Sequence, residues 1–287
     1  MCDENTVQDN ARVLGVTRRA FTAGTLAASV AMMLPKVANA LSVTEQDVVV
    51  STPDGEADCF FVAPSTGRHP GVLIWPDILG LRPAFRAMGR RLAESGYAVR
   101  VVNPYYRTAQ APVVAEGATF QDPVVREKLM GLAQTLSAAT NVTDAEAFVT
   151  FLDAQASVDT RRKIGTTGYC MGGPMTMRTA AALPDRVGAG ASFHGGRLAT
   201  DGADSPHLLV PQMQAHYLFA IAENDDEREP DAKHVLREAF AAADLPAEIE
   251  VYEGALHGWC PPDSPVYHEA QAERAWDRLL NLLATAL

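Results

Sequence analysis

The run Gly168-Tyr169-Cys170-Met171-Gly172 has the residue types of a nucleophile held at a sharp turn. It follows the pattern Gly-x-nucleophile-x-Gly, with cysteine in the position that serine more often occupies. The glycines lack a Cβ atom, so they permit a turn that is too cramped for other residues. Such a turn would raise the Cys170 sulfur above a sheet, where a substrate can reach it. The run therefore predicts covalent catalysis by a thiolate.

Two further polar residues follow Cys170 in the order that a catalytic triad requires. His257 lies between small residues beyond a predicted strand, which is a suitable place for a general base. Asp225 directly follows another predicted strand, and an acidic residue there can hold the imidazole in the required tautomer. Glu223 and Asp226 lie in the same segment and are the alternatives to Asp225.

The order nucleophile, acid, histidine, with separations of 55 and 32 residues, is the order of the α/β-hydrolases. Three unrelated polar residues on surface loops would be the alternative explanation. Each of the three follows a predicted strand, and sites in parallel sheets gather at the carboxyl ends of strands. This coincidence favours a catalytic triad.

The elements that must position these residues alternate between strands and helices. Apolar runs and turn residues predict strands at 48–51, 57–62, 71–75, 98–102, 163–167, 187–193, 218–222 and 249–252. Helical periodicity predicts helices at 84–95, 122–135, 144–156, 174–183, 234–243 and 269–283. A capping box, Thr143 with Glu146, is expected to start the third helix.

Repeated strand–helix units predict the α/β class, with a mostly parallel twisted sheet covered by helices on both faces. The first two strands flank Thr52-Pro53-Asp54-Gly55 and are expected to form an antiparallel hairpin at one edge. No linker divides the chain, so residues 41–287 are expected to form a single domain with the α/β-hydrolase fold.

Residues 1–40 have the features of an export leader. Thr17-Arg18-Arg19-Ala20-Phe21 resembles a twin-arginine motif, and a mildly apolar stretch follows it. Ala38-Asn39-Ala40 has the form of a signal-peptidase site, so cleavage is expected after Ala40. The leader predicts a periplasmic or secreted protein that meets the twin-arginine export machinery transiently. The stretch is too short and too polar for a transmembrane helix, so no membrane association is expected after cleavage.

The chain has 287 residues and a net charge of −11. This acidic balance disfavours nucleic acid as a partner. Leader cleavage would leave Cys59, Cys170 and Cys260, an odd number that requires at least one free thiol. No His/Cys cluster has the spacing of a zinc site, so neither a metal nor another cofactor is expected.

The sequence resembles the dienelactone hydrolase family of α/β-hydrolases, which use a Cys-His-Asp triad. The resemblance runs from about Thr44 to the C-terminus. Its carriers are Gly168–Gly173, Ala222–Asp225, His257–Trp259 and Trp75–Gly80. The resemblance implies hydrolysis of activated esters or lactones of the dienelactone type.

The family also implies roles for the loop after the third strand. An acidic residue there, commonly Glu, contacts the resting thiol; this chain has Asp77, which is one methylene shorter. By the resemblance, Asp77 takes the thiol proton when substrate arrives; a turn-capping role is the alternative. The oxyanion hole carries over to the backbone N–H groups of Ile78 and Met171, and fixed donors of this kind stabilise developing charge.

Substrate-binding residues follow from the same resemblance. Pro104-Tyr105-Tyr106-Arg107 resembles a segment whose arginine binds a substrate carboxylate, so Arg107 is a candidate clamp and Tyr106 a neighbour in the pocket. A surface arginine is the alternative. His194 and Trp259 are expected to line the pocket as well, with a structural role as the alternative for His194. A second arginine that the family has shortly after the histidine is missing here.

The thiol itself constrains the substrate. A thiolate leaves more readily than an ordinary alkoxide, because the pKa of a cysteine thiol is only about 8.5. The tetrahedral adduct therefore goes forward only when the other group also leaves well, as the enolate of an enol lactone does. A broad carboxylesterase or thioesterase with the same triad is the second hypothesis. A redox-sensing protein on a hydrolase scaffold is the third.

Overall fold

The computed structural model describes residues 8–10 and 34–287 of the chain. The twin-arginine segment at residues 17–21 lies outside the described residues. The first strand begins at Val43, shortly after the expected cleavage site. Among the described helices, none is long and apolar enough to cross a bilayer.

Within the described residues, eight strands form one sheet in the order β1-β2-β4-β3-β5-β6-β7-β8. β2 runs antiparallel to its neighbours β1 and β4, and the remaining pairs are parallel. The strands are β1 (Val43–Thr52), β2 (Gly55–Pro64), β3 (Gly71–Trp75), β4 (Ala98–Val102), β5 (Ile164–Tyr169), β6 (Val187–Phe193), β7 (His216–Ala222) and β8 (Ala247–Tyr252). The mostly parallel sheet and the edge hairpin confirm the predicted α/β-hydrolase architecture.

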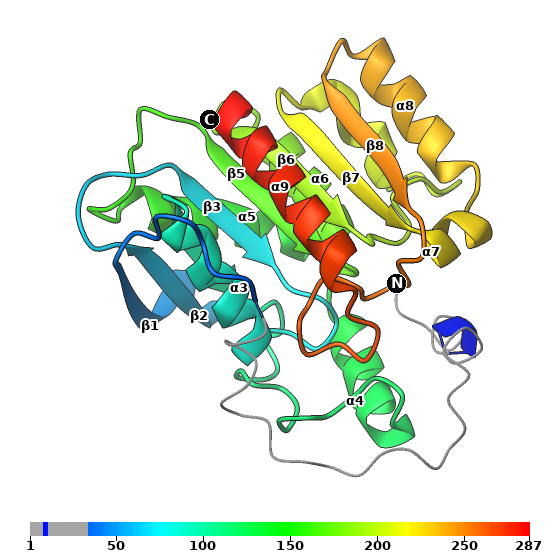
Figure 1. Cartoon of the computed structure of the whole chain (residues 1–287), viewed down its shortest axis with the longest axis horizontal. Helices are drawn as coiled ribbons and strands as arrows, with labels where there is room; N and C mark the ends of the chain where they lie inside the picture. Colours follow the sequence, from blue (N-terminus) through cyan, green and yellow to red (C-terminus); the bar gives the residue numbers. More distant parts are fainter. Residues whose placement is uncertain (1–7, 11–33) are drawn as a thin grey trace.

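Helices cover both faces of the sheet. They are α3 (Pro83–Glu94), α4 (Pro123–Ala133), α5 (Ala138–Asp153), α6 (Gly172–Ala182), α7 (Glu223–Arg228), α8 (Ala232–Ala242) and α9 (Glu269–Ala286), with a 3₁₀ helix η1 (Pro206–Gln212). Figure 1 shows α3 and α9 crossing the near face, with α5 and α6 behind the sheet. Their apolar faces pack on continuous buried strands such as β3, as expected for a parallel sheet covered on both sides.

The predicted start of α5 is wrong. α5 begins at Ala138, and its capping box is made by Ser137 and Thr140, not by Thr143 and Glu146. The Ser137 hydroxyl accepts from the Thr140 N–H at 3.1 Å, and Thr140 reciprocates through its own hydroxyl. Threonine replaces the usual Glu or Gln at the third helical position. The true cap therefore lacks the acidic or amide residue that the sequence pattern requires.

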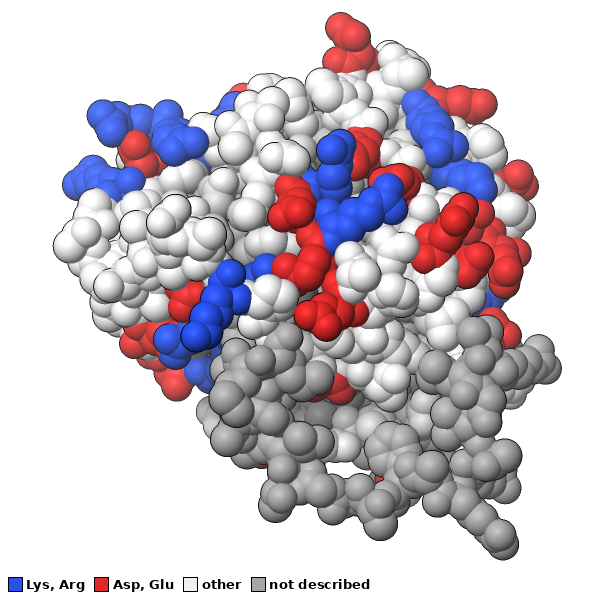
Figure 2. All heavy atoms as spheres, in the orientation of Figure 1, with Lys and Arg blue, Asp and Glu red and all other residues white. Residues whose placement is uncertain are grey.

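The surface carries both signs of charge. Figure 2 shows Lys and Arg side chains interspersed with Asp and Glu on the face that bears α3 and α9. Several of these charges form ion pairs between elements, for example Arg86 with Asp47 and Arg90 with Glu45. Exposed pairs of this kind contribute little stability. The two pairs link α3 to the edge strand β1. Because positive and negative side chains alternate, this face has no large patch of a single charge.

Candidate active site

Cys170 sits at the turn between β5 and α6. Its φ angle is +52°, in the left-handed region that residues with a side chain seldom adopt. Two hydrogen bonds hold this conformation: the Cys170 N–H donates to the Phe193 carbonyl at 3.0 Å, and the Gly173 N–H donates to the Cys170 carbonyl at 3.0 Å. The strand, the strained turn and the helix together form the predicted nucleophile elbow.

The glycines of the elbow allow backbones to approach one another. A Cβ atom on Gly168 would lie 2.1 Å from the Gly172 carbonyl oxygen. A Cβ atom on Gly172 would lie 2.3 Å from the carbonyl oxygen of Trp75, the last residue of β3. Neither position can hold a side chain unless the backbone moves. The glycines therefore set the separation between the elbow and the loop that follows β3.

Asp225 and His257 are in direct hydrogen-bond contact. His257 Nδ1 lies 2.9 and 2.7 Å from the two carboxylate oxygens of Asp225. Of the competing acids, Glu223 accepts a hydrogen bond from the Gly254 N–H, and Asp226 binds Lys233. The contact with the imidazole thus belongs to Asp225, which lies in the first turn of α7.

The imidazole of His257 also forms a hydrogen bond with the side chain of Cys170. His257 is 3% exposed. Burial acts against the charged imidazolium, but Asp225 and Cys170 outweigh it and raise the pKa of His257 to about 10. Cysteine, histidine and aspartate are therefore connected in the order of a triad, at the carboxyl ends of β5, β7 and β8.

The thiol is less accessible than the sequence suggests. Cys170 is 1% exposed, whereas the elbow was expected to present its sulfur to substrate. Beside the elbow, the Tyr105 hydroxyl donates to the Ile78 carbonyl at 2.8 Å and lies 3.3 Å from the Met171 sulfur. These contacts join the loop after β3 to the elbow through Tyr105. Side chains near Cys170 must move before a substrate can reach the sulfur.

The backbone N–H groups of Ile78 and Met171 lie on the two segments that Tyr105 joins. Within the described part of the chain, neither N–H donates a hydrogen bond to another backbone group or to a side chain. Unused donors next to a nucleophile are suited to bind an oxyanion. Tyr105 is a residue that sequence reasoning missed, although it lies in the Pro104–Arg107 segment, because the resemblance points only to its neighbours.

Asp77 forms an ion pair with Arg82 through its carboxylate. Its carboxylate oxygens accept from Arg82 Nη1 and Nη2 at 2.6 and 2.9 Å, and Oδ1 also accepts from the Leu79 N–H. Arg82 in turn binds Asp263. Burial raises the pKa of Asp77, although Arg82 opposes this, and the charge of Cys170 acts in the same direction as burial. Asp77 therefore caps its turn and lies near the thiol, but its carboxylate is already paired.

Arg107 and Tyr106 are also engaged within the chain. The Arg107 guanidinium binds Asp54 and Asp144, with N–O distances of 2.6 Å to each. The Tyr106 hydroxyl donates to Asp144 at 2.7 Å. One positive charge already faces two carboxylates here, so a third carboxylate from a substrate would be repelled. Arg107 was expected to bind a carboxylate of the substrate, but it binds two carboxylates of the protein. No pattern in the sequence indicates this, because Asp54 and Asp144 lie far from Arg107 along the chain.

His194 and Trp259 lie beneath the triad. The His194 ring is 5.1 Å from the His257 ring, and Trp259 stacks on Tyr252 with 4.8 Å between centroids. His194 is 0% exposed, and its ring nitrogens have no hydrogen-bond partner among the described residues. Burial lowers the pKa of His194 to about 3, and His257 acts in the same direction. His194 is therefore neutral and packs against the catalytic imidazole.

Two asparagines hold the segment around His257. Asn224 Oδ1 accepts from the His257 N–H at 2.8 Å, and Asn224 Nδ2 donates to Asn10 Oδ1 at 2.9 Å. Asn10 Nδ2 then donates to the His257 carbonyl at 2.9 Å. Sequence reasoning missed both residues, and Asn10 lies within the expected leader. Cleavage after Ala40 stays a prediction.

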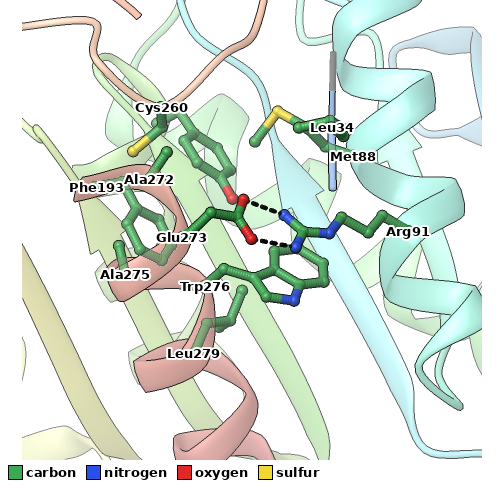
Figure 3. A pocket seen from close by; sticks show the side chains of 11 residues that line it. Leu34, Met88, Arg91, Phe193, Cys260, Ala272, Glu273, Ala275, Trp276 and Leu279 are labelled. Atoms are coloured by element: carbon green, nitrogen blue, oxygen red, sulfur yellow. Dashed lines mark hydrogen bonds and ion pairs between the residues drawn. The ribbon is translucent and has the colours of Figure 1, made fainter. Parts of the chain in front are cut away.

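Two cavities among the described residues differ greatly in size. Figure 3 shows the smaller one, between α3 and α9, where Arg91 and Glu273 pair beside Cys260 and Trp276. Its volume of about 20 Å³ holds no more than a water molecule. Cys59, Cys170 and Cys260 are free and buried, and no described group of His, Cys, Asp and Glu could hold a metal ion. The larger cavity, about 280 Å³, adjoins Met171.

Replacing Gly172 tests the close approach at the elbow. Gly172→Ala should lower the free energy of unfolding by about 2–3 kcal/mol, because the new Cβ forces the backbone of Trp75 away. It should also remove most ester hydrolysis. Urea unfolding and initial rates measure both effects.

Gly131→Ala is the matched control. Gly131 lies in α4, and a Cβ atom added to it would meet no atom within 4 Å. The variant should gain about 0.4–1 kcal/mol, since alanine restricts the unfolded chain. Equal stability of the two variants would contradict the account of the elbow.

Comparison with known proteins agrees with this geometry. A model of the "Dienelactone hydrolase family" matches residues 57–287. A putative carboxymethylenebutenolidase of Salmonella typhi is 26% identical over 223 residues, which cover 77% of this chain and 78% of the relative. A carboxymethylenebutenolidase of Pseudomonas putida is 27% identical and covers 77% and 88%.

Among solved structures, a putative dienelactone hydrolase of Klebsiella pneumoniae superposes with a TM-score of 0.72 at 23% identity, covering 85% of this chain and 99% of that one. This likeness supports the fold alone. The family match extends over most of the chain and includes the elbow, Asp225 and His257. The chain belongs to the dienelactone hydrolase family, whose members are hydrolases with the α/β-hydrolase fold.

Proposed function

We propose that this protein hydrolyses activated esters or lactones through a thioester on Cys170. The observation that carries the proposal is the hydrogen-bonded series Asp225–His257–Cys170 at one edge of the sheet. A nucleophile, a base and a group that orients the base are the parts that acyl transfer needs. The names of the bacterial relatives support a lactone or ester as the substrate class.

The proton of the Cys170 thiol rests on the imidazole of His257, whose pKa of about 10 keeps the ring charged at neutral pH, so acylation begins from a thiolate beside an imidazolium. The sulfur then bonds to the carbonyl carbon, and the carbonyl electrons move to oxygen. The N–H groups of Ile78 and Met171 bind this oxyanion. When the carbonyl re-forms, the C–O bond breaks, and the leaving oxygen takes the proton from His257. A lactone opens at this step, while an ester releases its alcohol.

Deacylation returns the enzyme to its starting state. Neutral His257 removes a proton from water, and the hydroxide attacks the thioester carbonyl. The C–S bond breaks, the sulfur becomes a thiolate beside the imidazolium again, and the carboxylic acid leaves. Asp225 stabilises the imidazolium in both halves and keeps Nδ1 protonated. Because Asp77 is bound to Arg82, we assign the proton transfers to His257, with Asp77 as a fixed charge near the thiol.

The substrate should have a leaving group that competes with a thiolate. An enolate or phenolate does so. When the other group is a simple alkoxide, the adduct expels the thiolate instead and returns to the reactants. Arg107 is already bound by two carboxylates, and the family's second arginine is missing. The family's namesake lactone carboxylate would therefore lack its usual partners here.

We also propose export of the folded domain by the twin-arginine route. The motif at residues 17–21, the Ala38-Asn39-Ala40 site and the start of β1 at Val43 support it. Cleavage after Ala40 would leave all eight strands intact and remove Asn10 from the His257 segment.

A covalent intermediate provides the direct test of the thioester. After rapid acid quenching during turnover of an aryl ester, mass spectrometry should find the acyl group on the peptide containing Cys170. Cys170→Ala should lose both adduct and turnover, and Cys170→Ser should lose at least about 100-fold in kcat/KM on an enol lactone. Cys260→Ala is the control and should keep both. An adduct elsewhere, or an unimpaired serine variant, would refute the mechanism.

The charge state of His257 predicts a pH dependence. Its pKa of about 10 means that the imidazolium is fully present below pH 6.5 and is lost as the pH rises through 10. Asp225→Asn removes the main positive contribution to that pKa, so the imidazolium disappears nearer pH 6.5. At pH 7, alkylation of Cys170 by iodoacetamide should then be at least about tenfold slower than in the wild type, because the thiolate loses its charged partner.

The two alkylation rates should converge above pH 10, as the wild type also loses its imidazolium. Asp226→Asn is the matched control, because Asp226 binds Lys233 and not the imidazole. Identical profiles for the wild type and Asp225→Asn would show that Asp225 does not set the charge of His257.

A further inference from the structure

The cavity of about 280 Å³ begins one residue from the nucleophile. Met171, which carries a proposed oxyanion donor, lines it together with Pro174, Met175 and Arg178. These four positions fall on one face of α6, because their spacing is that of successive helical turns. With a rise of 1.5 Å per residue, Arg178 lies about 10 Å along the helix from Met171. The cavity thus leads from the elbow towards a guanidinium.

The guanidinium of Arg178 is poorly satisfied inside the protein. Its Nε is buried without a hydrogen-bond partner, and no carboxylate among the described residues lies within ion-pair distance of it. Burial lowers the pKa of Arg178, and the charge of Asp204 only partly opposes this. Arg197 adds a second positive charge to the lining. Two arginines and one aspartate give the lining of the cavity a net positive charge.

Asn141 provides a second, independent observation. It lines the same cavity from α5 and is 4% exposed. Neither its amide nitrogen nor its amide oxygen has a hydrogen-bond partner in the part of the chain that the structure describes. Leaving a buried polar group unsatisfied is unfavourable, so native proteins seldom do so unless a ligand or water supplies the partner.

The remaining lining is mixed, because Ser137, Thr200 and Ser205 stand beside apolar side chains. Ala133 and Leu136 contribute to the apolar walls. A volume of about 280 Å³ is close to the lower end of the range for small-molecule sites, and such sites combine apolar walls with a few polar groups. The cavity therefore suits an elongated molecule with an apolar body and one charged end.

We propose that this cavity is the acyl-binding site, and that Arg178 with Asn141 binds an anionic group at the end of the acyl chain remote from the scissile carbonyl. The inference rests on the proposed function of Cys170. It makes Arg178 a specificity-determining residue for monoesters of long-chain dicarboxylic acids. A carboxylate next to the scissile bond, by contrast, would lie too far from Arg178.

Matched pairs of substrates test the proposal. Each pair consists of a p-nitrophenyl ester of a dicarboxylic acid with its far carboxylate free, and the same ester with that carboxylate capped as a methyl ester. Over a series of chain lengths, the wild type should prefer the free acid by at least about tenfold in kcat/KM at its best length, since a charge-assisted contact with a partly buried arginine is strong. Arg178→Gln should reduce the preference to about one by raising KM.

Two further variants separate this role from a general effect. Arg178→Lys should restore part of the preference, because it keeps the charge without the planar fork. Arg68→Gln makes the same charge change on an exposed residue before β3, at the opposite end of that strand from the elbow, and should keep the full preference. Arg68→Gln should also hydrolyse the capped esters at wild-type rates within about twofold, and circular dichroism spectra like that of the wild type should show that the Arg178 variants fold.

Calorimetric binding to Cys170→Ala distinguishes failure of the inference from failure of the proposed function. The probes are the monomethyl esters of the same dicarboxylic acids. Binding that Arg178→Gln weakens at least about tenfold, without turnover of any ester by the wild type, would keep the anion site and refute the hydrolase mechanism. Turnover with no preference for free acids at any length, or a preference unchanged in Arg178→Gln, would overturn the inference.

Discussion

The Asp225 carboxylate determines what a buried imidazole can do in this protein. His257 and His194 lie with their rings 5.1 Å apart, and both are almost fully buried. Only His257 has a carboxylate against its ring, and the pKa values of the two diverge to about 10 and about 3. Burial acts on both rings in the same direction, so the difference comes from the charges that each ring meets. The neutral ring fills space beside the charged one without competing for its proton.

That contact requires two loops to be positioned with a precision of a few tenths of an ångström, because the hydrogen bond depends on the distance between the His257 ring and the Asp225 carboxylate. β7 and β8 are parallel neighbours, so their carboxyl ends bring Asp225 and His257 to the same edge. Asn224 then ties the two loops through the His257 N–H. On the other side of the site, Gly172 lets the elbow lie against the end of β3. Rigid elements set the coarse positions, while small and amide side chains set the final distances.

The sequence predicts the strands, the elbow and the order of the triad well, because each depends on local patterns: buried apolar runs, glycines at a tight turn, and acids or histidines after strands. It also restricts the acid to three neighbours, but only the structure brings Asp225 to the ring. The errors have non-local causes. Arg107 is bound by residues 53 and 37 positions away, and the Tyr105 hydroxyl binds the Ile78 carbonyl 27 positions before it. Such partners leave no periodic signal in the sequence.

Arg107 and Arg178 show why the type of a residue is insufficient to assign its role. Arg107 faces two carboxylates, whereas Arg178 has none within ion-pair distance among the described residues. An arginine that already pairs with two carboxylates of the protein does not attract a further anion. A partly desolvated arginine without an ion-pair partner is stabilised when an anion binds to it. The field around each guanidinium therefore moves the expected anion site from the segment after β4 to the face of α6.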